Sequence, residues 1–83
     1  MKKIAVIGAV LDEPEREQEE FNTVVSDFKG IVRGRMGIPM KDMGVGVISI
    51  TVTGELDEIN SFVGNLGKIQ GVTVKAAFSK KEY

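Results

Sequence analysis

The chain has 83 residues, of which 11 are basic and 12 acidic, so its formal net charge is −1 at pH 7. This balance gives no general attraction to nucleic acid or to an anionic membrane, and we expect neither as a direct partner. The chain contains no cysteine and no histidine, which excludes disulfide bonds and removes the usual ligands of a transition-metal site. Small domains have thin cores and commonly add a disulfide, a metal or a partner subunit. Because the first two are missing, we expect a homo-oligomer, either a dimer or a tetramer.

The first predicted element is a strand from Lys3 to Leu11, because that stretch is apolar at nearly every position. Such a pattern is typical of a strand buried on both faces at the centre of a sheet. A basic start before an apolar run also resembles a signal peptide, but the acidic segment 12–15 follows at once without a small-residue cleavage site. No stretch approaches the roughly 20 apolar residues that span a bilayer. We therefore expect a cytoplasmic protein without a membrane segment.

A helix is predicted to begin at Asp12 or Glu13, because Pro14 is well tolerated in a first helical turn and acidic side chains there complement the helix dipole. Gly30 stands where a helix C-terminal glycine belongs. The second half of this helix carries an apolar stripe that would pack on a sheet, formed by Phe21, Val24, Val25 and Phe28.

The beginning of the same helix is rich in carboxylates, namely Asp12, Glu13, Glu15, Glu17, Glu19 and Glu20. Oxygen ligands of this kind suit a hard cation. However, the spacing fits no calcium loop, and glutamates at these positions spread around a helix instead of converging. We interpret the run as a solvated helix end and expect no metal site.

Two extended runs, residues 31–38 and 45–53, are joined by a short connection that holds Pro39 and Gly44, which predicts a β-hairpin. In the first run, alternation places Arg33 and Arg35 together on the face opposite Met36. In the second run both faces are largely apolar or β-branched, so neither is built only to meet water. One face carries Val45, Val47, Ser49, Thr51 and Thr53, and the other carries Gly46, Ile48, Ile50 and Val52.

The remaining elements are a second helix beginning near Glu55 and a last strand over residues 72–79. Gly67 is expected to close the helix and Gly71 to turn the chain. The helix has apolar residues at spacings of three and four, namely Leu56, Ile59, Phe62, Val63, Leu66 and Ile69. The strand alternates so that only one face belongs to the core, and residues 79–83 are predicted to form a flexible, solvated tail.

The order strand, helix, strand, strand, helix, strand predicts a single α+β domain over residues 1–83 with a ferredoxin-like βαββαβ fold. Right-handed crossovers place both helices on one face of a four-stranded antiparallel sheet. The other face then lacks a cover, although about four or five of its side chains are apolar. At roughly 1.5–3 kcal/mol for each large side chain buried, a subunit interface there is a substantial gain. We expect that interface to contain Val45, Val47, Ser49, Thr51, Met40 and Met43.

No catalytic arrangement is recognisable in the sequence. An enzyme of the nucleophilic or acid–base kind needs a nucleophile, a base and an oxyanion site in one pocket, and no motif surrounds any serine, lysine or carboxylate here. We therefore expect no catalytic residue and no cofactor.

The pair Arg33 and Arg35 is the best candidate for binding a ligand. Two guanidinium groups about 7 Å apart on one strand face suit a carboxylate or a phosphate. Two alternatives remain open: a salt bridge to an acidic residue of the same or a neighbouring subunit, or an edge strand guarded by charge. We favour these two structural alternatives over ligand binding.

The chain resembles the small regulatory family of the iron-only hydrogenase system. The resemblance covers almost the whole chain, and its most specific part is the segment Gly34-Arg35-Met36-Gly37-Ile38-Pro39, together with the segments 47–50, 64–69 and 71–75. Proteins of this family look like members of the ACT-like group, which are small βαββαβ regulatory modules that associate and bind effectors between subunits. They are also similar to the C-terminal domain of nickel-responsive repressors. This chain lacks the histidine and cysteine that bind nickel in those repressors, which argues against direct metal sensing.

The resemblance implies a regulatory role linked to hydrogenase maturation or expression. Our first hypothesis is an oligomeric ACT-like module that binds a small effector at a subunit interface near Arg33 and Arg35. The alternative is a protein–protein adaptor or structural oligomerisation module without a ligand, whose partner is a hydrogenase maturation factor or a transcription factor.

Overall fold

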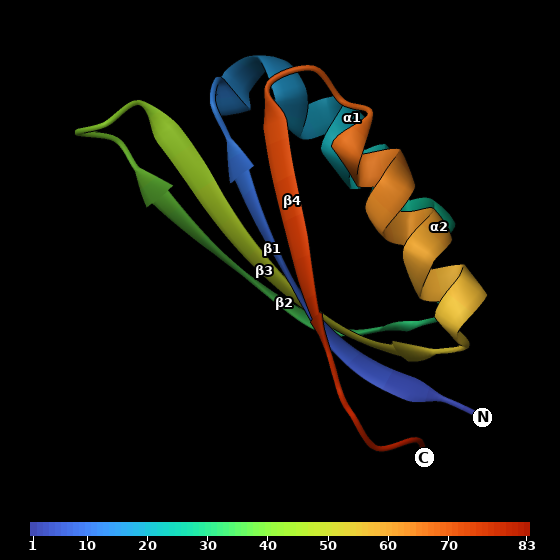
Figure 1. Ribbon diagram of the computed structural model, residues 1–83. Helices are drawn as coiled ribbons and strands as arrows, with labels where there is room; N and C mark the ends of the chain where they lie inside the picture. Colours follow the sequence, from blue (N-terminus) through green and yellow to red (C-terminus); the bar gives the residue numbers. More distant parts are fainter.

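The computed structural model describes all 83 residues as one four-stranded antiparallel sheet with two helices. The elements are β1 (Lys3–Leu11), α1 (Pro14–Asp27), β2 (Val32–Met40), β3 (Val45–Gly54), α2 (Leu56–Gly67) and β4 (Val72–Phe78). The strand order is β2-β3-β1-β4, and both helices lie on the same side of the sheet (Figure 1). The predicted α+β, ferredoxin-like βαββαβ fold is therefore confirmed, and β1 and β3 are the central strands.

Burial alternates along β1 from Ala5 onward, because the helices cover only one face of the sheet. Ala5, Ile7, Ala9 and Leu11 are buried, whereas Val6 on the other face is 50% exposed. The core lies between the sheet and the helices and is completed by Phe21, Val25, Ile31, Ile50, Val52, Ile59, Phe62, Leu66 and Ile69. Strand β1 is thus covered on one face, and the cover predicted for its other face is not present within one chain.

Helix α1 begins at Pro14, directly after the predicted start at Glu13, but its acidic first half is not solvated throughout. Glu17 is only 4% exposed, and its Oε1 accepts a hydrogen bond of 3.0 Å from the backbone N–H of Glu13, the residue that precedes the helix. Gly71, in the turn before β4, leaves the space that the other carboxylate oxygen of Glu17 occupies. The prediction of a solvated helix end is therefore wrong for Glu17, which caps its own helix and contacts the turn before β4.

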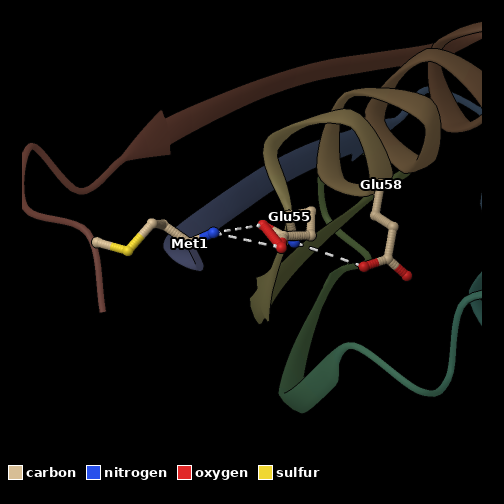
Figure 2. Close-up of polar contacts among 3 residues, drawn as sticks. All are labelled: Met1, Glu55 and Glu58. Carbon is tan, nitrogen blue, oxygen red and sulfur yellow. Dashed lines mark hydrogen bonds and ion pairs between the residues drawn. The ribbon is translucent and has the colours of Figure 1, made fainter.

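Helix α2 begins with a similar polar contact, which Figure 2 shows. The backbone N–H of Glu55 donates to Oε1 of Glu58 at 3.4 Å, and the amino group of Met1 lies 3.2 Å from Oε2 of Glu55. Both members of this ion pair are largely exposed, so its contribution to stability is small. Neither helix has the length and apolar composition needed to cross a membrane.

A β-bulge in β2 breaks the alternation that the sequence suggested for this strand. Val32 pairs with Val52, and Gly34 pairs with the adjacent residue Thr51, so Arg33 is the extra residue. From this point the register places Gly34, Met36, Ile38 and Met40 on the open face of the sheet and Arg35 on the helix side, opposite Ile50. The prediction of regular alternation through this strand is therefore wrong at the bulge, where Val32 lies on the helix side with Val52 and not on the face of Gly34, Met36 and Ile38.

The last residues run beside the beginning of the chain. The backbone N–H of Tyr83 donates to the carbonyl of Lys2 at 2.7 Å, and the N–H of Lys2 donates back to Tyr83 at 3.2 Å. The side chain of Ser79 also accepts a hydrogen bond from the N–H of Ile4. That residues 79–83 form a flexible tail stays a prediction, and these bonds show where the tail docks.

Candidate functional site

The face of the sheet that the helices leave uncovered, here called the open face, is the candidate functional site. Strand register assigns its residues to rows across the strands. From the hairpin end, the rows are Met40 and Val45; Ile38, Val47, Val10 and Thr73; Met36, Ser49, Gly8 and Lys75; and Gly34, Thr51, Val6 and Ala77. The first two rows are almost wholly apolar, whereas the next two contain small and hydroxyl side chains.

Several large apolar side chains of the open face are in contact with solvent. Met36 is 63% exposed, and Val6, Val10 and Ile38 are also exposed. Large exposed apolar patches mark interaction sites more often than inert surface. The structure places five of the predicted interface residues on this face: Met40, Val45, Val47, Ser49 and Thr51. Their role in an interface stays a prediction.

Met43, the sixth predicted interface residue, lies in the connection between β2 and β3 and is 67% exposed. Figure 1 shows this connection at the left end of the view. Methionine is flexible and polarisable, so it adapts to irregular surfaces. The hairpin end is therefore a second exposed apolar feature, continuous with Met40 and Val45 of the open face.

The two predicted ligand-binding arginines have different surroundings. Arg35 lies on the helix side, where its Nη1 donates to Oδ1 of Asn22 at 3.0 Å and its guanidinium lies 5.8 Å from the centre of the Phe21 ring. Arg33 is exposed at the bulge and makes no hydrogen bond or ion pair through its side chain. The structure thus gives Arg35 a partner and Arg33 none, and neither arginine forms a salt bridge within the chain. Their joint role in ligand binding stays a prediction.

We expect Arg35→Ala to lower the free energy of unfolding by about 0.5–1 kcal/mol, because it removes a hydrogen bond and a cation–π contact at an exposed site. The matched change Arg33→Ala should alter it by less than about 0.5 kcal/mol, as is usual for a surface residue without partners. Urea unfolding followed by circular dichroism measures both values. Equal losses for the two variants would contradict the assignment of Arg35 to the helix side.

A shallow groove of about 910 Å³ lies between the beginning of α1 and the end of the hairpin. Its charged groups include Glu13, Glu15, Arg16 and Lys41. Arg16 and Glu13 already form an exposed ion pair at 2.6 Å, and no group of three acidic side chains converges here or elsewhere as a metal site would require.

Two residues that the structure makes prominent were not among the predicted site residues. Lys75 is the one charged residue that regular pairing places on the open face, opposite Gly8. Alternation in β4 already put Lys75 on the face away from the core, so this position was accessible from sequence. Glu17 is different, because only a contact with a distant turn reveals that its carboxylate is buried.

Comparisons with known proteins agree with the fold. The solved structure of uncharacterized protein TM1266 from Thermotoga maritima matches with a TM-score of 0.91 and 25% identity over 96% of this chain and 100% of that one. The ACT domain of a GTP pyrophosphokinase from Chlorobium tepidum matches with a TM-score of 0.72 and 17% identity over 96% of this chain and 89% of that one. The second identity is low enough that this likeness concerns the fold alone.

An enzyme also shares the fold. SnoaB, a cofactor-independent oxygenase from Streptomyces nogalater, matches with a TM-score of 0.60 and 9% identity over 100% of this chain and 96% of that one. At this identity the match carries no functional information, and the fold by itself does not separate regulators from enzymes. No curated protein matches the chain.

A family comparison matches residues 3–76 to the TM1266-like family, whose description is "Iron-only hydrogenase system regulator, putative". The match spans nearly the whole chain, from the first residue of β1 into β4. It agrees with the structural likeness to TM1266 and with the ACT-like arrangement of the sheet. The chain therefore belongs to the TM1266-like family of iron-only hydrogenase system regulators and has an ACT-like fold.

Proposed function

We propose that this protein is a cytoplasmic regulatory module of the iron-only hydrogenase system that acts as a homo-oligomer and binds a small effector between subunits. The observation that carries the proposal is the open face, whose apolar side chains have no cover within one chain. Each large apolar side chain removed from water contributes roughly 1.5–3 kcal/mol. Covering Val6, Val10, Met36 and Ile38 together therefore provides a substantial driving force for association.

The proposal assigns the protein no catalytic residue and no cofactor. The family description concerns regulation, and a regulatory module needs two states whose balance a ligand changes. An effector held between two open faces would stabilise the associated state, because it contacts both subunits only there. Among the arginines, Arg33 is the one without a partner, so it is the remaining arginine candidate for an anionic effector.

A second candidate function is an adaptor that binds another protein without a ligand. The exposed hairpin end favours it, because Met40 and Met43 provide an adaptable apolar surface that projects from the sheet. Its partner would be a hydrogenase maturation factor or a transcription factor. In this case, removing the hairpin methionines would weaken the binding of that partner and leave the oligomeric state unchanged.

Val47→Asp tests the proposed assembly, because Val47 lies in the apolar rows of the open face between Ile38 and Val10. The new carboxylate has no basic partner in its row and would be costly to bury. We expect self-association to weaken at least about tenfold, the effect of about 1.4 kcal/mol. Sedimentation equilibrium measures the association constant, and circular dichroism checks that the variant is folded.

The matched control is Leu56→Asp, which replaces another exposed apolar side chain at the first position of α2. It lies away from the open face, and an acidic residue at a helix beginning is favourable, so association should not change. Equal weakening by both variants would contradict an interface on the open face. A wild-type protein that stays monomeric at micromolar concentration would overturn the proposed assembly altogether.

A further inference from the structure

The open face carries a marked imbalance of charge. Its regularly paired residues include one cation, Lys75, and no acidic residue. Arg33, at the bulge, lies in the other edge strand, β2. Lys75 is exposed and takes part in no side-chain hydrogen bond or ion pair. Its ammonium group is therefore free to bind an anion from outside the chain.

Gly8 lies beside Lys75 in the central strand β1, and nothing within the chain requires a glycine there. Its φ is not positive, and an added Cβ would meet its nearest atom, the carbonyl oxygen of Lys75, only at 4.0 Å. Glycine within a strand costs about 0.5–1 kcal/mol relative to alanine. A glycine inside a strand often marks a place where a ligand or another backbone approaches closely.

Ser49 completes the row, because it pairs with Gly8 on the side opposite Lys75. Two strand spacings separate Ser49 from Lys75, so their Cα atoms are roughly 10 Å apart. The intervening surface is the bare backbone of Gly8. A hydroxyl donor and an ammonium donor thus flank an open floor wide enough for one oxyanion group.

The paired rows of a second copy do not supply the missing negative charge. If two open faces pack together, each brings its own Lys75 and neither brings a carboxylate from its paired rows. Burial of an ammonium group without an anionic partner is strongly unfavourable. A bound anion would then supply the counter-charge.

We infer that the open face binds the phosphate or carboxylate group of a small molecule over Gly8, between the Lys75 ammonium and the Ser49 hydroxyl, and that a second copy closes over it. This inference rests on the proposed assembly through the open face. It assigns the anion to Lys75, on β4, in preference to Arg33 on β2. Binding and association are then coupled, because the anion removes the charge penalty of the interface.

Sedimentation equilibrium at pH 7 tests the inference, with sodium phosphate, sodium acetate and sodium chloride compared at equal ionic strength. The proteins are wild type, Lys75→Met, Arg33→Met and Lys68→Met, where Lys68 is an exposed lysine at the end of α2. Phosphate, acetate or both should tighten association of the wild type at least about tenfold relative to chloride. Arg33→Met and Lys68→Met should respond in the same way.

Lys75→Met should behave differently in two respects. It should associate more tightly than the wild type in chloride, because a neutral side chain replaces an unpaired charge. It should also show no response to phosphate or acetate. An oxyanion response that survives in Lys75→Met, or one that disappears in Arg33→Met, would overturn the inference.

Failure of the inference differs from failure of the proposed assembly. A wild-type protein that associates equally in all three salts would overturn the Lys75 site and leave the assembly standing. A wild-type protein that remains monomeric in every salt would overturn the assembly itself, and the inference with it.

Discussion

Replacing Gly71 by alanine is expected to lower the free energy of unfolding by about 2–5 kcal/mol, a large share of the 5–15 kcal/mol typical of a domain. Gly71 has a φ of +88°, a conformation that costs an L-residue about 1–2 kcal/mol. An added Cβ would also overlap Oε2 of Glu17. Displacing that carboxylate breaks its hydrogen bond to the Glu13 N–H, which adds about 1–3 kcal/mol when a buried group is left unpaired.

Gly64→Ala is the matched control for this substitution. Gly64 lies inside α2, and no atom lies within 4 Å of an added Cβ. Alanine is favoured over glycine in a helix by about 0.8–1 kcal/mol, so this variant should be more stable than the wild type. Urea unfolding followed by circular dichroism gives both values. A Gly71→Ala variant as stable as the wild type would contradict the contact between Glu17 and the turn before β4.

Replacing Phe62 by alanine is expected to lower the free energy of unfolding by about 3–5 kcal/mol, the usual cost of removing a large aromatic side chain from a core. Phe62 is fully buried on the sheet side of α2, and its ring stacks on that of Phe28 at a centroid distance of 5.0 Å. A domain of 83 residues has few such side chains to lose. Thermal and urea unfolding measure the loss.

Phe28→Ala provides the comparison for Phe62→Ala, because Phe28 is only partly buried and lies just beyond the end of α1. Its loss should be smaller. In a double-mutant cycle, the two rings should couple by about 0.5–1.5 kcal/mol. A cost for Phe62→Ala no larger than that for Phe28→Ala would show that the ring is not central to the core.

Much of the fold follows directly from the apolar pattern. The boundaries of β1 agree with the prediction from Lys3 to Leu11, because a continuous apolar run between lysines and acidic residues leaves little choice. The stripes on both helices identified the residues that contact the sheet, including Phe21 and Phe62. Hydrophobic periodicity reports which face of an element is covered, and in this chain that signal is strong throughout.

The bulge in β2 and the burial of Glu17 could not be predicted in the same way. Alternation assumes a regular strand, so one extra residue at Arg33 places Val32 on the face opposite to the predicted one. Glu17 has the composition of a surface residue, and its burial depends on a turn 54 positions further along the chain, at Gly71. Both features arise from pairing between distant segments, which local patterns do not encode.

The candidate site also has residues that regular alternation predicts and residues that it does not. The open-face positions Val45, Val47, Ser49 and Thr51 could be predicted, because alternation in β3 is regular. The surroundings of the two arginines could not be predicted, because the bulge at Arg33 breaks the regular pairing of β2. The roles of these residues in assembly and in ligand binding stay predictions that the association measurements above address.

The position of β1 between β3 and β4 also affects how the protein forms during synthesis. The first strand of the chain pairs with the last, with Leu11 opposite Val72, so one of its edges stays unsatisfied until nearly all residues have left the ribosome. The capped beginning of α1 depends on the same late segment, since the N–H of Asp12 donates to the carbonyl of Gly71. Contacts of such long sequence separation slow folding, and a nascent chain that ends before β4 would expose an aggregation-prone edge of its central strand.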